Sequence, residues 1–214
     1  ALYRNLGEFQ FEEITEQAGL SSKSWSTGVT VADVNQDGWL DIYVCVSGKV
    51  SPDQRRNLLY LNNGDLSFTE SAVRFGIADE GHSTQAAFFD YDKDGDLDLY
   101  VMTHANESYT YISKLHTFTD GTAPSTDRLY ENIGPDSLGH PYFRDVSARA
   151  GILIEGYGLG LAISDLNQDG WPDIYVANDF IGNDLLYINQ QDGTFQNMLK
   201  ELTQHTSQNG MGTD

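Results

Sequence analysis

The chain has 214 residues, enough for a substantial hydrophobic core, and 32 Asp and Glu residues against 12 Lys and Arg give it a formal net charge of -20. Nucleic-acid binding rests on clustered Lys and Arg, and the sequence holds no basic run, so we expect no nucleic-acid partner. The acidic residues are interleaved with Tyr, Phe, Ile and Val, which argues against disorder. A solvating surface or cation sites then remain as reasons for the charge.

The sequence favours neither redox chemistry at cysteine nor a membrane span. The single cysteine, Cys45, lies in an apolar run, and we expect a small buried residue rather than a nucleophile or a disulfide partner. No apolar run approaches the roughly 18 residues of a membrane span. The sequence from Ala1 lacks the charged and apolar segments of a signal peptide, so any targeting segment is expected outside these residues.

One acidic pattern occurs three times, and two shorter elements accompany it. The acidic pattern reads DVNQDGWLDIYV from Asp33, DYDKDGDLDLYV from Asp90 and DLNQDGWPDIYV from Asp165. The second element reads LLYLNNGDLSF from Leu58, RLYENIG from Arg128 and LLYINQQDGTF from Leu185, and the chain begins with the same element as LYRNLGEFQF. The third reads ITEQAGL, ESAVRFGI and VSARAGI, with a helical turn expected to end at Gly19, Gly76 and Gly151. The chain is therefore a repeated unit.

Each unit predicts four short strands. In the first complete unit we expect them at Ser26–Ala32, at Ile42–Val46, at LLYLN from Leu58 and at Phe68–Ala72. The strand IYVCV is apolar on both faces, which is typical of a sheet covered on both sides. Four-stranded blades packed radially against their neighbours meet that requirement, so we predict an all-β fold, a β-propeller with cation-binding hairpin loops.

The spacing of the repeats divides the chain into blades. We assign residues 1–22 to the outer strands of a preceding blade, 23–77 to a blade, 78–152 to a blade with an insertion at 103–127, 153–203 to a blade and 204–214 to the start of the next. Gly28 and Gly160 each precede an acidic loop by five residues, so Gly212 predicts a further loop just beyond Asp214. Propellers have roughly 4 to 8 blades, and we therefore expect a partial propeller, a closed four-bladed ring being the alternative with one blade incomplete.

The acidic loops have the spacing D-x-[DN]-x-D-G-x-x-D, which offers oxygen ligands alone. Side chains at positions 1, 3, 5 and 9 and a carbonyl at position 7 can converge on one ion, while glycine at position 6 permits the turn. Flexible sets of oxygen ligands are typical of Ca²⁺, whereas zinc and copper favour His or Cys. We therefore predict three Ca²⁺ sites, with the position-7 residue acting through its carbonyl: Asp33, Asn35, Asp37, Trp39 and Asp41; Asp90, Asp92, Asp94, Asp96 and Asp98; Asp165, Asn167, Asp169, Trp171 and Asp173.

The loops have two other interpretations. An EF-hand requires Glu at position 12 and flanking helices, but position 12 is Val44, Val101 or Val176 inside β-forming runs. A metal-free acidic turn with Asx caps is the second alternative, and three copies with the same ligand positions argue against it. Since ligand charge helps set affinity, we expect the middle loop, with a carboxylate at position 3, to bind calcium most tightly.

The loops D-x-[DN]-x-D-G-x-x-D-[IL]-Y-V, with LY-x-N-x-G and A-G-[IL], resemble FG-GAP/VCBS repeats, as found in the integrin α-subunit propeller. The sequence is most similar in character to the secreted cartilage acidic protein (ASPIC/UnbV) group and its bacterial relatives. The resemblance covers the chain outside residues 103–127. It implies a seven- or eight-bladed propeller, calcium in the hairpin loops and an extracellular or cell-surface setting, without implying one function.

The insertion is the candidate ligand site, because loops carry function on rigid scaffolds. Its aromatic and imidazole side chains, which suit sugar stacking or a protein contact, are Tyr109, Tyr111, His116 and Phe118; a flap packed on its own blade is the alternative. No catalytic motif appears. We expect a non-enzymatic, calcium-stabilised extracellular or cell-surface module that binds a protein or glycan. The alternatives are part of a polysaccharide-degrading enzyme and an architectural subunit of a surface assembly.

Overall fold

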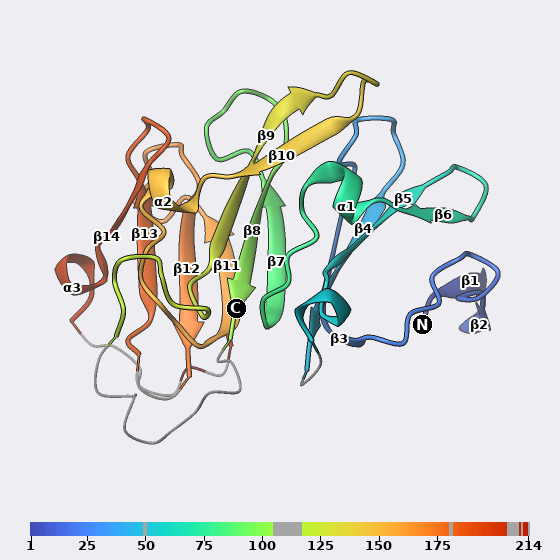
Figure 1. The fold of residues 1–214 in the computed structure, drawn as a ribbon, viewed down its shortest axis with the longest axis horizontal. Coiled ribbons are helices and arrows are strands. Elements are labelled where there is room, and N and C mark those ends of the chain that lie inside the picture. The colour runs from blue at the N-terminus through green and yellow to red at the C-terminus, as the bar shows by residue number, and fades with distance from the viewer. Residues whose placement is uncertain (49–50, 105–116, 180–181, 205–209, 211, 214) are drawn as a thin grey trace.

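The computed structural model describes residues 1–48, 51–104, 117–179, 182–204, 210, 212 and 213. These residues form three four-stranded antiparallel sheets and one two-stranded hairpin, which follow one another across Figure 1 from the blue N-terminal end to the red C-terminal end. In each four-stranded sheet the strands are neighbours in chain order. The fold is therefore all-β and built from repeated units, as the sequence predicts.

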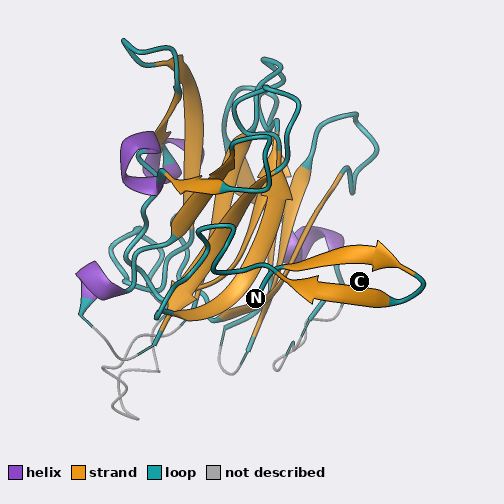
Figure 2. Cartoon of the chain, turned by 90° about the vertical axis from the view of Figure 1, so that its right-hand side faces the viewer, coloured by secondary structure: helices purple, strands orange, loops and turns teal. Residues whose placement is uncertain are grey.

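The strands have the following bounds. The hairpin consists of β1 (Tyr3–Gly7) and β2 (Gln10–Glu13), and the first sheet of β3 (Trp25–Ala32), β4 (Asp41–Ser47), β5 (Leu58–Asn62) and β6 (Phe68–Glu70). The second sheet consists of β7 (Ser83–Phe89), β8 (Asp98–Thr103), β9 (Arg128–Pro135) and β10 (Pro141–Asp145), and the third of β11 (Gly158–Ser164), β12 (Asp173–Asn178), β13 (Leu185–Asn189) and β14 (Phe195–Asn197). The helical elements of the described residues are short: a 3-10 turn at Pro52–Gln54, α1 (Ala72–Phe75), α2 (Ser147–Ala150) and α3 (Leu199–Leu202), all outside the sheets in Figure 2.

Each acidic loop joins the first two strands of a sheet. The strand pairs that flank the loops close at equivalent places, with Ala32 opposite Asp41, Phe89 opposite Asp98 and Ser164 opposite Asp173. The residue at position 9 is thus the first residue of the second strand in all three units. Because a meander returns at each turn, His104 and residues 117–127 of the β8–β9 connection lie at the opposite end of the second sheet from its acidic loop.

The hydrophobic cores lie between the sheets. One cluster packs Tyr43, Leu59 and Phe75 of the first unit against side chains of the second such as Leu99 and Phe143. A second cluster joins the second and third units in the same way. All six residues of β8 are buried, so the sequence-based expectation of a strand covered on both faces is confirmed most fully for the middle sheet.

The first sheet leaves one face open. Val29 and Val31 on β3 are 64% and 56% exposed. Their counterparts one repeat later, Ala86 and Phe88, pack into the core between the first and second units, where Phe88 meets Tyr43 edge-on. The open apolar face of the first sheet therefore corresponds to the face through which the second sheet packs on the first.

Glycine turns connect each unit to the next sheet. Gly76 and Gly151 both have a φ of +81°, and a Cβ at either position would lie 2.6 Å from the carbonyl oxygen of Phe143 or Phe195 on the outer strand of the following sheet. These left-handed positions confirm the helix ends predicted for α1 and α2. The turn at residues 15–19 likewise ends at Gly19, whose φ is +78°, and the Ala18 amide in it donates to the Ile14 carbonyl at 2.8 Å. One expectation needs correction: β6 ends at Glu70 instead of Ala72. The strand stops there because the Glu70 carboxylate accepts the Ala72 amide hydrogen at 2.8 Å, which starts α1.

The expectations for Cys45 and for membrane spans can also be compared with the structure. Cys45 is fully buried on β4, and burial raises the pKa of its thiol to about 12, so it packs as a small apolar side chain. None of the helices within the described ranges combines the length and apolar character needed to cross a membrane.

Candidate metal centre

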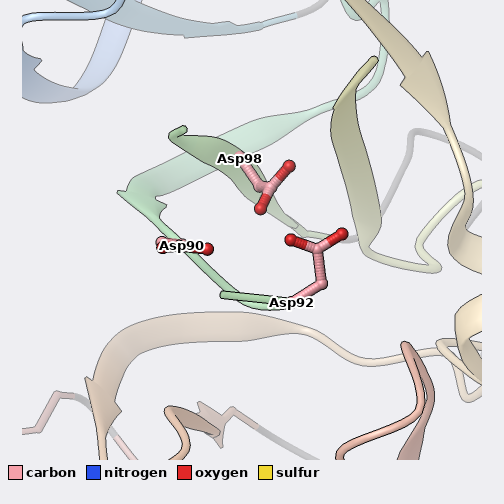
Figure 3. Close-up of side chains that lie close together, drawn as sticks. All are labelled: Asp90, Asp92 and Asp98. Atoms are coloured by element: carbon pink, nitrogen blue, oxygen red, sulfur yellow. The ribbon is translucent and has the colours of Figure 1, made fainter. Parts of the chain in front are cut away.

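The three acidic loops share one backbone path. The residue at position 4 has a positive φ in each, 57° at Gln36, 60° at Lys93 and 63° at Gln168, and the glycine at position 6 has a φ between 90° and 97°. Glycine adopts such angles without a steric penalty, which explains its place there. The two left-handed residues curl the chain so that the side chains at positions 1, 3 and 9 turn toward the inside of the loop, as Figure 3 shows for the second loop.

The second loop brings three carboxylates together. One oxygen each of Asp90, Asp92 and Asp98 lie within 4.8 Å of one another (Figure 3). Asp90 Oδ1 and Asp96 Oδ1 are buried and have no hydrogen-bond partner in the part of the chain that the structure describes. Buried polar atoms are normally paired, so these carboxylate oxygens have room to accept a hydrogen bond from water or to contact a cation. The donor set consists of oxygens, and it fits a hard divalent ion such as Ca²⁺.

The aspartate at position 9 also supports the backbone. Asp98 accepts the Tyr91 amide hydrogen at 3.1 Å through Oδ2 and the Asn132 amide hydrogen at 2.8 Å through Oδ1. Asp41 and Asp173 make the same pair of bonds in their units, to Val34 and Asn62 and to Leu166 and Asn189. Each of these carboxylates thus ties its loop to the third strand of the sheet. The asparagine in LY-x-N therefore belongs to the site, and sequence reasoning missed it although it recurs in all units.

The outer loops differ from the middle one at position 3. Asn35 Nδ2 donates to Asp37 Oδ2 at 2.9 Å, and Asn167 Nδ2 makes the same bond to Asp169 Oδ2 at 2.9 Å. The side chains at positions 3 and 5 of these loops are therefore engaged with each other. The cluster of three carboxylates found among the described residues consists of positions 1, 3 and 9 of the second loop. The outer loops have asparagine at position 3 and so hold one carboxylate fewer at these positions.

Burial sets the electrostatics of the second loop. Burial raises the pKa of the Asp98 carboxyl to about 8. Burial, followed by the neighbouring Asp94 carboxylate, raises the pKa of Asp96 to about 6 and also raises that of Asp92. In the exposed third loop the opposite holds, because the Trp171 amide and the Asn167 side chain hydrogen-bond to Asp169 and lower its pKa. The second loop thus carries crowded negative charge that a bound cation would offset.

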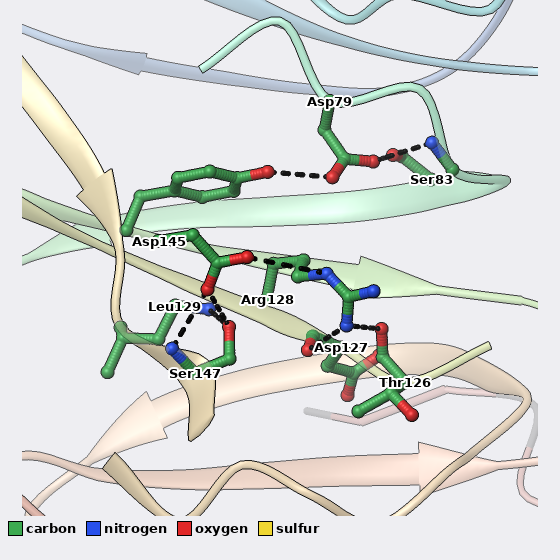
Figure 4. Close-up of polar contacts among 10 residues, drawn as sticks. Asp79, Ser83, Thr126, Asp127, Arg128, Leu129, Asp145 and Ser147 are labelled. Atoms are coloured by element: carbon green, nitrogen blue, oxygen red, sulfur yellow. Dashed lines mark hydrogen bonds and ion pairs between the residues drawn. The ribbon is translucent and has the colours of Figure 1, made fainter. Parts of the chain in front are cut away.

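A second set of buried acids lies at the other end of the sheets. Asp127 accepts the Tyr100 hydroxyl at 2.6 Å and the Thr103 amide at 2.7 Å. Arg128 beside it donates to the Thr126 carbonyl at 2.8 Å, as Figure 4 shows. Asp184 bonds Tyr175 and Asn178 in the third unit, and Asn57 bonds Tyr43 and Val46 in the first. Sequence reasoning missed these residues. Their signal is a polar residue placed directly before the strands that begin at Leu58, Arg128 and Leu185.

The candidate ligand region is described only in part. Tyr109, Tyr111 and His116 lie outside the described residues. Phe118 is 50% exposed, and its backbone is fixed because its amide donates to Glu155 Oε1 at 2.9 Å and its carbonyl accepts the Glu155 amide at 2.9 Å. Its ring is therefore presented to solvent from an anchored backbone.

Comparison with known proteins bears on the family. The sequence model of the FG-GAP-like repeat matches residues 1–44, 46–101 and 165–213, which together make up more than half of the chain. The chain belongs to the FG-GAP-like repeat family. The matched segments contain all three acidic loops, whereas residues 102–164 lie outside them, so the match rests on the repeats described above.

Curated relatives of this FG-GAP-like repeat protein carry the name cartilage acidic protein 1. The Xenopus tropicalis protein is 26% identical over 179 residues, and the Homo sapiens protein is 25% identical over 179 residues; in both cases the alignment covers 83% of this chain and 24% of the relative. The chain therefore spans about a quarter of the length of these relatives. A solved structure of an Agrocybe aegerita lectin, described as recognising non-reducing terminal N-acetylglucosamine, is 17% identical with a TM-score of 0.45, covering 87% of this chain and 42% of that one.

Proposed function

We propose that this chain is part of a calcium-stabilised β-propeller that serves as a non-enzymatic recognition module outside the cell. The observation that carries the proposal is the second acidic loop, where oxygens of Asp90, Asp92 and Asp98 lie within 4.8 Å of one another beside two unpartnered buried carboxylate oxygens. The ligands would be the five residues of each acidic loop, with position 7 contributing its carbonyl. Calcium supplies the positive charge that such a cage needs.

Calcium in these loops would act as a staple within each sheet. The position-9 aspartate begins the second strand and already accepts a hydrogen bond from the third strand, at Asn132 in the middle unit. An ion held by the same carboxylate and by position 1 would tie the end of the first strand to this pair. Free calcium then stabilises the folded form by mass action, since it binds the folded loop and not the unfolded chain.

The relatives and the surface support the proposed setting and partner. The curated relatives are named for cartilage, which supports an extracellular place for this chain. Calcium sites of extracellular modules have dissociation constants on the order of 10⁻⁴ to 10⁻³ M, which suits calcium concentrations outside cells. The partner would be a protein or a glycan that contacts the end of the sheets opposite the acidic loops, where Phe118 is exposed on its anchored backbone.

Calcium titration tests the staple. Isothermal titration of the full chain with CaCl₂ is expected to give binding at three sites, and EGTA is expected to lower the melting temperature. Asp94→Ala removes a predicted ligand, and Asp136→Ala is its control. Asp136 is an exposed acid of the β9–β10 turn, and its side-chain hydrogen bonds within the described residues stay in that turn, with the Leu138 and His140 amides. Unchanged melting in EGTA, or equal effects of the two substitutions, would refute structural calcium.

The partner is tested separately. A glycan array and a panel of extracellular-matrix proteins probed with the calcium-loaded chain are expected to give a bound class. Phe118→Ala should weaken that binding while leaving the melting temperature within a degree or so, because the ring is half-exposed and the Glu155 bonds are made by the backbone. Binding that persists at full strength in Phe118→Ala would place the partner site elsewhere.

A further inference from the structure

The second and third acidic loops are in direct contact across the boundary between their sheets. Lys93, at position 4 of the second loop, extends to the third loop, and its ammonium nitrogen lies 4.5 Å from the centroid of the Trp171 ring. The same nitrogen is 3.6 Å from the place where a Cβ on Gly170 would lie. Positive φ at position 4 directs this side chain away from its own cage and toward the next one.

A buried hydrogen-bond chain joins the same two loops. Asn189 Nδ2 donates to the Tyr91 carbonyl at 2.8 Å, and the Asn189 amide donates to Asp173 Oδ1 at 2.9 Å. Tyr91 in turn donates its own amide hydrogen to Asp98 Oδ2 at 3.1 Å. One asparagine, 2% exposed, therefore lies between the position-9 carboxylates of two neighbouring loops.

The contact between the first and second loops is weaker in kind. Gln36, at position 4 of the first loop, donates through Nε2 to the Gly95 carbonyl at 3.2 Å in an exposed position. An exposed neutral hydrogen bond competes with water, whereas a buried amide bond and a cation over an indole ring are less easily replaced by solvent. The second and third loops are thus joined by stronger contacts than the first and second loops.

We propose that the second and third loops bind calcium as a positively coupled pair, while the first loop binds nearly independently of the third. The inference rests on the proposed calcium function. Ordering of the second loop by an ion fixes Tyr91 and Lys93, which hold Asn189 and Trp171 in place and so reduce the entropy that the third loop loses on binding. Repulsion between the ions opposes this coupling, but salt screens charges on exposed loops over about 8 Å at physiological ionic strength. By linkage, the third loop favours the second by the same factor.

Trp171 is a reporter placed in the third loop. The chain has three tryptophans, and Trp25→Phe with Trp39→Phe leaves Trp171 alone. In that background a calcium titration followed by Trp171 fluorescence gives the midpoint of the third loop, and Asp169→Ala should abolish the response. Asp94→Ala disables the second loop at position 5, and Asp37→Ala disables the first loop at the same position.

The proposal expects Asp94→Ala to raise the Trp171 midpoint by about fivefold or more, the usual lower range of coupling between sites. Asp37→Ala should change it by less than about twofold. Asn189→Ala should remove the dependence on Asp94, whereas Asn62→Ala, the equivalent residue of the first unit, should not. Lys93→Gln, which gives the second loop the residue that the other loops have at position 4, is an exposed variant that should reduce the dependence without risk to folding.

The outcomes separate the two proposals. If calorimetry detects calcium binding but Asp94→Ala leaves the Trp171 midpoint unchanged, the coupling is overturned and the calcium function stands. Equal shifts from Asp94→Ala and Asp37→Ala overturn the asymmetry on which the inference depends. If calorimetry detects no calcium binding and Trp171 fluorescence does not respond to calcium, both the calcium function and the coupling are overturned.

Discussion

The two ends of the second sheet bury carboxylates in opposite ways. At the loop end, Asp90 and Asp96 each keep one buried oxygen unpaired next to the oxygens of Asp92 and Asp98. At the other end, Asp127 is more deeply buried, yet each of its oxygens accepts a hydrogen bond, from Tyr100 and from Thr103. Burial alone therefore does not identify a cation site. The difference is whether protein donors already occupy the carboxylate oxygens.

The largest effect is expected at the paired end. Asp127→Ala leaves the Tyr100 hydroxyl and the Thr103 amide buried without their acceptor, and each such group costs about 1–3 kcal/mol. We expect a loss of about 3 kcal/mol in the free energy of unfolding, equal in calcium and in EGTA, measured by urea denaturation. Asp127→Asn is the control, because Asn57 occupies this place in the first unit, where its Oδ1 accepts the Val46 amide hydrogen and its Nδ2 donates to the Tyr43 hydroxyl. A loss confined to calcium-containing buffer would break the comparison between the two ends.

The paired end should also produce a pH dependence. Burial raises the pKa of Asp127 to about 7, although the Tyr100 hydroxyl, the Thr103 amide and Arg128 act to lower it, and Tyr187 lies nearby. The folded state therefore holds this proton more tightly than the unfolded state. Its contribution to stability is full below about pH 4 and is lost as pH rises toward about 7, with a slope of at most about 1.4 kcal/mol per pH unit.

The variant Asp127→Asn isolates this term, since an amide does not titrate. The difference in unfolding free energy between the natural chain and Asp127→Asn, both in EGTA, should move in favour of Asp127→Asn as pH rises from 4 to about 7 and then stay constant. The loop carboxylates titrate in both proteins and cancel in the difference. A difference that stays flat over this window would show that Asp127 is ionised throughout.

At the loop end, exchanging the residues at position 3 should reverse the order of calcium affinity between the middle and outer loops. Asp92→Asn gives the second loop the asparagine of its neighbours, and Asn35→Asp gives the first loop a third carboxylate before position 9. We expect calcium affinity to fall several-fold, up to about tenfold, in Asp92→Asn and to rise in Asn35→Asp, because ligand charge helps set affinity. Calorimetry on the two single variants and the double variant would show whether the ranking of the loops follows this residue.

The sequence was sufficient to locate the loops and their difference at position 3, but not the contacts between them. The repeat of D-x-[DN]-x-D-G-x-x-D identified the turn, and glycine at Gly76 and Gly151 marked the helix ends, because these features depend on local backbone conformation. The contact of Lys93 with Trp171 depends on how neighbouring units are rotated, which residue spacing does not reveal. The role of Asp127 was missed because its partners come from β8, and a single polar residue before a strand resembles an ordinary turn residue.

The smallest effect on stability is expected for a substitution of Asp96. This substitution tests whether the ligand at position 7 is the side chain or the backbone carbonyl. In the outer loops this position is Trp39 or Trp171, so the predicted ligand there is the backbone carbonyl, and the Asp96 carboxylate adds charge beside Asp94 without a partner for Oδ1. Asp96→Asn should therefore keep the number of bound calcium ions unchanged. In EGTA it should raise the unfolding free energy by about 0.5 kcal/mol, because a partly buried like-charge contact is removed. Loss of one bound ion in calorimetry would mean that the side chain itself is a ligand, and the middle loop would then differ from the outer loops in its coordination as well as in its charge.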